Sequence, residues 1–161
     1  LSNVNRSAIR RGSQLVTEGF MDTTGRMGAE ISLLSRTERV IRHQQRVRLH
    51  VGTDEVMARV FLVSSDKQKT LQPGESGTAL FRLDREIPLA MDDALILRFY
   101  SPTETIGGGV VIDTDPPARW NICRKWLGSL AGSTREDRME KFLQASAKKP
   151  LTFQCHRSPV V

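Results

Sequence analysis

Apolar and polar residues alternate along most of the first 115 residues of the chain. In the clearest example, residues 46–51, Val47, Leu49 and Val51 fall on one face while two arginines and a histidine fall on the other. This two-residue period is typical of a strand with one buried face. The same pattern predicts strands near residues 13–16, 28–34, 55–63, 76–83, 94–99 and 105–112. Such regularly spaced strands, separated by Gly, Pro and Asp, indicate an antiparallel β-sandwich or β-barrel.

The pattern changes after residues 116–117, where two prolines form a stiff joint. Apolar residues then recur at the spacing of one helix face, namely Trp120, Cys123, Leu127 and Leu130. A capping box over residues 133–136 predicts a second helix, which Pro150 ends. Its inward face is expected to carry Met139, Phe142 and Leu143. The chain is therefore predicted to be mainly β, with a short α-helical segment after the β domain.

The composition is that of an ordinary globular protein, with 39% hydrophobic and 26% charged residues among 161. No apolar run approaches the length of a membrane span, and nothing resembles a signal peptide. Cys123 and Cys155 are too few and too far apart for a metal site, so two reduced thiols are favoured. These features predict a cytoplasmic protein without a membrane partner.

Motifs of the common catalytic sites are absent from the sequence. It contains no Gly-x-x-x-x-Gly-Lys-Ser/Thr loop, dinucleotide fingerprint, His-Glu-x-x-His or Gly-x-Ser-x-Gly. The carboxylate pair Asp92-Asp93 is interpreted as a turn, and the couple Cys155-His156 lacks a third group to orient it. We therefore expect no catalytic residue and no metal site, and no enzyme activity from this chain alone.

Charge is distributed unevenly along the chain. The net charge is +6, yet acidic residues outnumber basic ones over residues 51–115 and basic residues dominate on either side. The densest basic cluster, called the arginine loop below, contains Arg36, Arg39, Arg42, His43, Arg46 and Arg48. Guanidinium groups bind phosphates through paired hydrogen bonds, and no aromatic residue interleaves with the cluster to stack on bases. The cluster favours binding to the backbone of double-stranded RNA, with an ordinary solvated loop as the alternative.

A glycine-rich hairpin spans residues 98–113. Its first strand must stop at Ser101-Pro102, because proline denies the sheet a hydrogen-bond donor. Three glycines, Gly107 to Gly109, then precede a β-branched run. They permit a bulge, a barrel corner or the close approach of another backbone, and the barrel corner is the preferred interpretation. A phosphate-binding loop is disfavoured because a strand, not a helix, follows the glycines.

The hairpin and the prolines after it contain a set of motif residues, namely Ser101, Pro102, Thr105, Ile106, Gly107, Gly108, Gly109, Asp113, Pro116 and Pro117. This set resembles the final hairpin of the third domain of elongation factor Tu, and most closely that of selenocysteine-specific translation elongation factors. Further blocks similar to the same family occur in the same order at residues 9–15, 48–60, 71–83 and 126–130. Together the blocks extend the resemblance over most of the chain.

The resemblance implies a division into domains. Residues 1–14 would be the end of a preceding second β-barrel domain, and residues 15–115 an elongation factor Tu domain 3-like antiparallel β-barrel. Residues 116–161 would be a helical linker that leads to a winged-helix region. Because no GTPase motif is present, the chain is expected to be a fragment of a longer factor.

The resemblance also implies a function. Members of the family are GTPases that carry selenocysteyl-tRNA to the ribosome at a recoded UGA codon, and the third domain grips the acceptor and T-arm of the tRNA. By this resemblance the contacts come from the arginine loop and from Ser101, Thr103 and Thr105. The chain itself would bind no cofactor, because GTP and Mg²⁺ belong to a GTPase domain that would be its partner in cis. An mRNA hairpin would be bound only by a C-terminal region beyond this chain, and a monomer is expected.

Two other functions remain open at this point. The barrel could be a structural module that docks on a GTPase domain, with the arginine loop as a protein interface. It could also be a free-standing basic RNA-binding β-barrel, which would bind tightly without regard to tRNA.

Overall fold

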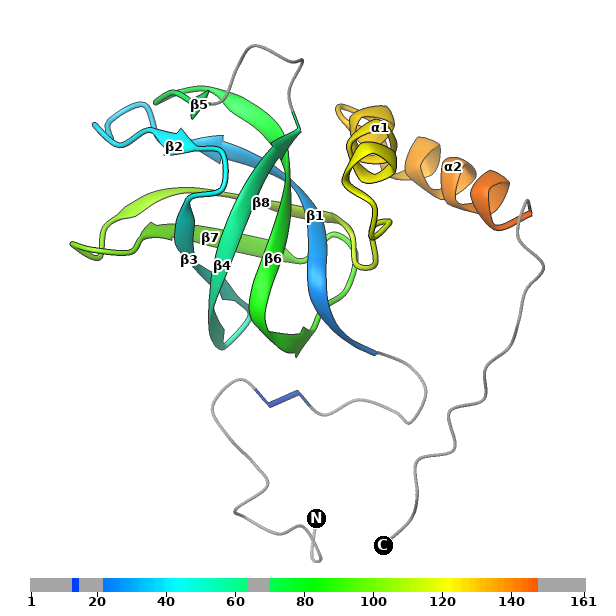
Figure 1. Ribbon diagram of the computed structural model, residues 1–161, viewed down its shortest axis with the longest axis horizontal. Coiled ribbons are helices and arrows are strands. Elements are labelled where there is room, and N and C mark those ends of the chain that lie inside the picture. Colours follow the sequence, from blue (N-terminus) through cyan, green and yellow to red (C-terminus); the bar gives the residue numbers. More distant parts are fainter. Residues whose placement is uncertain (1–12, 15–21, 64–69, 148–161) are drawn as a thin grey trace, which may run out of the picture. The chain divides into compact units, whose positions relative to one another are not determined.

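The computed structural model describes residues 13–14, 22–63 and 70–147 of the chain (Figure 1). The chain divides into two compact units between Ala131 and Gly132, and each unit is described separately. The first contains all the strands and one helix, and the second contains the other helix. Residues 13–14 are exposed and are assigned to no strand, whereas the rest of the strand predicted at residues 13–16 and the segment 1–12 lie outside the described residues.

Six antiparallel strands close into a barrel (Figure 1). They are β1 (Thr23–Leu33), β3 (Arg46–Val51), β4 (Asp54–Val63), β6 (Ser76–Pro88), β7 (Ala94–Phe99) and β8 (Thr105–Asp113). Around the barrel they follow the order β1-β6-β4-β3-β7-β8. Two short strands, β2 (Ile41–Arg42) and β5 (Thr70–Leu71), pair with each other outside it. The predicted mainly β fold and antiparallel barrel are confirmed.

The core of the barrel comes from the apolar face of each strand. In β3, residues alternate strictly between buried apolar and exposed or half-buried polar side chains, as the sequence pattern predicts. Phe81 and Met27 are the largest side chains that are fully buried, and Ile31, Leu49 and Leu97 pack into the same cluster. Because the barrel is closed, none of these strands has a free edge with a row of unpaired backbone groups. The strands expose their polar faces to solvent.

The three glycines lie in the middle of β8 and allow the close approach of another backbone. They pair with β1 on one side and with β7 on the other. A Cβ atom on Gly107 would overlap the carbonyl oxygen of Ser32, and one on Gly109 would overlap that of Glu30. Close approach of another backbone, one of the three roles that the sequence left open, is therefore what the glycines provide here.

Helix α1 (Trp120–Leu130) packs on the outside of the barrel, against β4 and β6. Its buried residues are Cys123, Leu127 and Leu130, which confirms the predicted helix face. Leu127 sits directly over Gly28, where a side chain would displace it. The Trp126 indole donates a 2.6 Å hydrogen bond to Asp113, the last residue of β8. Burial raises the pKa of the Asp113 carboxyl above its usual value, although this bond and the Asp115 amide oppose the shift.

Helix α2 (Arg135–Ala147) begins with a capping box, but one residue later than the sequence predicts. Thr134 Oγ1 accepts a hydrogen bond from the Asp137 amide, and the Asp137 carboxylate accepts one from the Thr134 amide. These bonds also hold the pKa of Asp137 below its usual value. The predicted inward face is wrong for Met139 and Leu143, which are 62% and 68% exposed. Pro150 lies outside the described residues.

Candidate nucleic-acid interface

The arginine loop connects β1 to β3 and is held against the β7–β8 hairpin. The backbone amide of Leu34 donates to the carbonyl oxygen of Ile106 at 2.9 Å. The buried hydroxyl of Thr37 contacts the Glu104 carboxylate, and the Arg39 guanidinium pairs with the same carboxylate at 3.4 Å. Glu104, the sole charged residue between Tyr100 and Thr105, therefore joins the two predicted binding segments.

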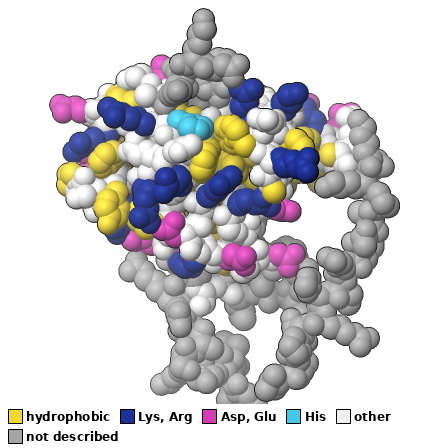
Figure 2. Space-filling model, viewed as in Figure 1, with side chains coloured by type: hydrophobic (Ala, Val, Ile, Leu, Met, Phe, Trp, Pro, Cys, Tyr) yellow, Lys and Arg dark blue, Asp and Glu magenta, His cyan; other side chains and the backbone are white. Residues whose placement is uncertain are grey.

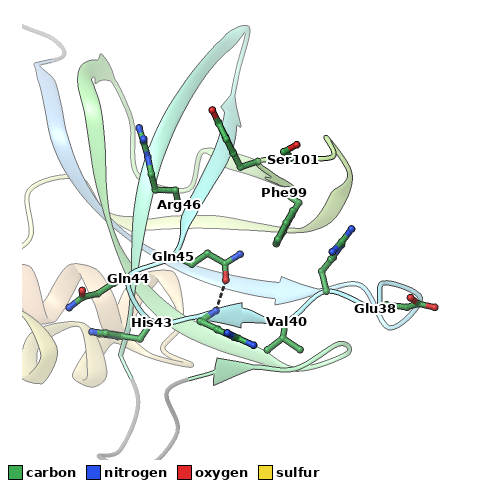
Figure 3. A pocket seen from close by; sticks show the side chains of 11 residues that line it. Glu38, Val40, His43, Gln44, Gln45, Arg46, Phe99 and Ser101 are labelled. Carbon is green, nitrogen blue, oxygen red and sulfur yellow. Dashed lines mark hydrogen bonds between the residues drawn. The ribbon is translucent and has the colours of Figure 1, made fainter.

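A tight turn over residues 42–45 aims the second half of the loop. Gln44 has a φ of 67°, in the left-handed region, and its amide donates to the carbonyl oxygen of Val60. The Gln45 side chain accepts a 2.9 Å hydrogen bond from the Arg42 amide (Figure 3). In return, the Gln45 amide donates to the Arg42 carbonyl oxygen at 3.1 Å. The turn is thus closed by its own side chain, which leaves the Arg42 guanidinium exposed.

An open pocket of about 720 Å³ lies between the arginine loop and the end of β7 (Figure 3). Its lining residues are Glu38, Arg39, Val40, Arg42, His43, Gln44, Gln45, Arg46, Phe99, Tyr100 and Ser101. Five of the residues predicted from the sequence therefore meet here, namely Arg39, Arg42, His43, Arg46 and Ser101. They come from two segments more than fifty residues apart in sequence.

The arginines of the pocket differ in their partners. Arg39 lies over the Phe99 ring, 4.7 Å from its centroid, and is paired with Glu104. Arg46 forms an ion pair with Asp84 of β6, in which both side chains are about half exposed. Arg42 has no ion pair within the described residues. All three guanidinium groups remain reachable from solvent, where a surface ion pair contributes little and exchanges readily.

Four predicted residues lie outside the pocket lining, and they occupy different places. Arg36 is exposed in the turn after β1, and Thr103 and Thr105 are exposed on the β7–β8 hairpin. Arg48 is half-buried on the outer face of β3 and pairs with Glu55 at 2.5 Å. None of these four residues belongs to the pocket lining.

His43 takes part in an aromatic cluster. Its ring lies 5.6 Å from the rings of both Phe61 and Trp120, in edge-to-face arrangements. Figure 3 shows the ring pointing away from Phe99 and Ser101. His43 therefore packs the arginine loop against β4 and the first residue of α1, even though it borders the pocket.

Sequence reasoning missed the aromatic side of the pocket. Phe99 and Tyr100 line it, and Tyr100 is 55% exposed. The sequence pattern contains no aromatic residue within the arginine loop, but the tertiary fold places two beside it. Their position follows from strand register, since β3 pairs with β7 and Val47 lies opposite Phe99, and the sequence pattern carries no signal for that pairing.

Other kinds of site find little support in the described part of the chain. Among residues 13–14, 22–63 and 70–147, no three His, Cys, Asp or Glu side chains are grouped as a metal site requires. Neither of the described helices has the length and apolar character needed to cross a membrane. Burial raises the pKa of the Cys123 thiol, which favours its neutral form.

Comparison with known proteins places the fold in a family. Residues 29–118, which comprise all but the start of the barrel, match the family model described as the selenocysteine-specific elongation factor, β-barrel domain. A selenocysteine-specific elongation factor from Desulfomicrobium baculatum is 29% identical over 125 residues. The match covers 76% of this chain and 19% of that protein, so the chain spans about a fifth of its relative's length. The chain belongs to the β-barrel domain family of selenocysteine-specific elongation factors.

Proposed function

We propose that this barrel binds selenocysteyl-tRNA, by gripping the sugar-phosphate backbone of the acceptor and T-arm helix. The observation that carries the proposal is the pocket, in which arginines of the loop face the end of β7 across an open space of about 720 Å³. A groove with basic walls accepts a phosphate backbone, and its polar groups can donate to phosphate and ribose oxygens. Arg42 is the most available of the pocket arginines, because it is exposed and, unlike Arg39 and Arg46, has no ion pair among the described residues.

The ion pairs of the pocket support binding that depends on salt. Glu104 and Asp84 each hold an exposed arginine in place while no polyanion is bound. A phosphate can replace either carboxylate, because exposed pairs in water are worth only about 0–1 kcal/mol. The arginines are thus positioned before the RNA arrives, which lowers the entropy cost of binding.

Phe99 and Tyr100 add an interaction that a purely basic groove lacks. Arg39 is stacked on Phe99, so the plane of its guanidinium is set by the ring. Tyr100 is largely exposed beside it and can donate its hydroxyl to a phosphate or ribose oxygen. Ser101, Thr103 and Thr105 supply further hydroxyl donors along the hairpin.

The wider role follows from the family. We propose that the longer factor delivers the tRNA to the ribosome at UGA, with GTP and Mg²⁺ bound by a GTPase domain in cis. An mRNA hairpin would be bound by a region outside this chain. The present sequence has no phosphate-binding Gly-Lys-Ser/Thr loop, so the barrel would act by binding alone and take no part in GTP hydrolysis.

The test is a double variant, Arg39→Gln with Arg42→Gln, in the 161-residue chain. Binding of an unmodified selenocysteine tRNA transcript is measured by fluorescence anisotropy over a range of KCl concentrations. The slope of log affinity against log salt is expected to become shallower by about two, roughly one for each phosphate that is no longer neutralised. The matched control is Lys125→Gln with Arg135→Gln, which removes two charges from exposed helix positions.

If the salt slope of the variant Arg39→Gln with Arg42→Gln equals that of the control, the proposal is contradicted. If the affinity for the tRNA falls equally in both double variants, net charge alone attracts the RNA, and not the pocket.

A further inference from the structure

Four arginines stand directly opposite one another across four neighbouring strands of the barrel. In the strand register Arg46 of β3 pairs with Arg59 of β4, and Arg59 pairs with Arg82 of β6. Arg82 in turn pairs with Arg26 of β1. We call this set the arginine row. With adjacent strands about 4.8 Å apart, the row extends over roughly 14 Å of the outer surface.

The row faces solvent. Arg46, Arg59 and Arg82 are exposed, and the Arg26 side chain is 35% exposed. Figure 2 shows a band of basic side chains across the face on which β4, β6 and β1 lie in Figure 1. None of the four arginines is among the buried residues of the barrel.

Among the residues that the structure describes, carboxylates neutralise only the two ends of the row. Arg26 pairs with Asp115 at 3.0 Å, and Arg46 reaches Asp84. The Arg59 side chain has no ion pair or hydrogen bond within the described residues. Arg82 has no carboxylate partner there and instead lies 4.7 Å above the centre of the Phe61 ring. Stacking on an aromatic face fixes the guanidinium plane while its edge N–H groups stay free to bind an anion.

This arrangement is unfavourable for the barrel by itself. Like charges directly opposite each other on adjacent strands repel and destabilise the sheet. A row of evenly spaced cations suits a ligand whose anions are also evenly spaced, as the phosphates along one strand of a nucleic acid duplex are. Isolated anions or an acidic peptide would not need four guanidiniums in line.

We infer that the arginine row is a second phosphate-binding surface, which extends the RNA path out of the pocket and across the barrel. Arg46 belongs to both surfaces, since it lines the pocket and begins the row. A backbone that leaves the pocket at Arg46 therefore meets Arg59, Arg82 and Arg26 in turn. The ligand is the duplex backbone of the same tRNA, so the inference rests on the proposed function.

The experiment compares three double variants of the 161-residue chain, each of which removes two positive charges. The row variant is Arg59→Gln with Arg82→Gln, and the pocket variant is Arg39→Gln with Arg42→Gln. The control is again Lys125→Gln with Arg135→Gln. Affinity for the selenocysteine tRNA transcript is measured against KCl concentration, and hydroxyl-radical footprinting records which riboses are protected.

The row variant is expected to lose about tenfold or more in affinity relative to the control, with a salt slope shallower by about two. Its footprint should lose protection at riboses next to those that the pocket variant exposes. Its thermal stability should change little, because the relief of like-charge repulsion offsets the lost stacking of Arg82 on Phe61. A row variant that loses affinity only because it is partly unfolded, as circular dichroism would show, overturns the inference.

The outcomes separate the two surfaces. If the pocket variant weakens binding and the row variant matches the control, the inference is overturned and the proposed function stands. If the row variant alone weakens binding, the row is supported and the pocket is not the site. If neither differs from the control, both are overturned.

Discussion

Gly107 and Gly109 set how closely β8 lies against β1. A Cβ atom on either glycine would overlap a carbonyl oxygen of β1. Backbone atoms cannot move aside as the end of a flexible side chain can, so the strand pair would have to separate. The requirement for glycine is therefore steric and not conformational, since neither residue has a positive φ.

Replacement of Gly109 by Ala is expected to lower the free energy of unfolding by about 1–3 kcal/mol, the usual cost of overpacking. Gly25→Ala is the control, because its Cβ would have only the Glu86 Cγ as a neighbour, at 3.7 Å. That variant should be equally stable or slightly more stable, since alanine loses less entropy on folding. Urea unfolding of both variants measures the difference, and equal stabilities would refute the steric argument.

Helix α1 illustrates how an element is formed by its own sequence and then positioned by the barrel. Its buried face is set by the spacing of Cys123, Leu127 and Leu130, which the sequence predicts. Its position on the barrel depends on Gly28 of β1, which leaves room for the Leu127 side chain. After Ala131, Gly132 adopts a φ of 65°, which ends the helix in the left-handed conformation that glycine favours.

Gly128 in the middle of α1 is exposed and weakens the helix, although no neighbouring group requires a glycine there. A Cβ there would have Val63 Cγ1, 3.9 Å away, as its nearest neighbour. Gly128→Ala should therefore raise the free energy of unfolding by about 0.8–1 kcal/mol. Gly132→Ala should lower it by about 1–2 kcal/mol, because its φ is positive. Thermal melting followed by circular dichroism measures both, and shifts of the same sign would contradict this account.

Across the whole first unit, the bond between Asp113 and Trp126 ties α1 to the closing strand of the barrel. Asp113 is 3% exposed, and burial raises its pKa despite two donated hydrogen bonds. The folded chain therefore binds a proton at this carboxyl more tightly than the unfolded chain does. Its contribution to stability is fully present below the usual pKa of 3.8 and is lost as pH rises through the native pKa.

Trp126→Phe is expected to raise the pKa of Asp113 further, because it removes a hydrogen bond to the ionised form. The stability of the variant relative to the parent chain should fall as pH rises above the usual carboxyl pKa of 3.8, by about 1.4 kcal/mol for each further unit of pKa. Unfolding by urea at several pH values, with NMR titration of the Asp113 carboxyl carbon, measures this. If the difference in stability between Trp126→Phe and the parent chain does not depend on pH, the bond does not act through the charge of the Asp113 carboxylate.

The strand pattern of the chain was sufficient to predict most of the barrel. Residues 46–51 and 94–99 form strands with the expected bounds, because strict alternation marks both faces and both ends of a strand. The helix of residues 120–130 was equally clear from its spacing. The two-residue strands β2 and β5 were not predicted, since they are too short to show a period.

The candidate interface was predictable only in part. The density of arginine between residues 36 and 48 is a property of the sequence, and so are the hydroxyl groups of Ser101, Thr103 and Thr105. The contacts of Arg39 with Phe99 and Glu104 could not be predicted from the sequence. They depend on the pairing of β3 with β7 and on how the loop folds over the ends of these strands. Periodicity says which face a residue occupies, but not which residue stands opposite.

The arginine row makes the same point more strongly. Arg26, Arg46, Arg59 and Arg82 are scattered along the sequence, and alternation predicts only that Arg46, Arg59 and Arg82 lie on the outer faces of their strands. Strand order and register bring them into line, because each strand of a closed barrel has two fixed neighbours. The sequence by itself thus determined the strands, their faces and the basic loop. The tertiary structure decided which charges stand side by side, since cross-strand neighbours are chosen by register and not by distance along the chain.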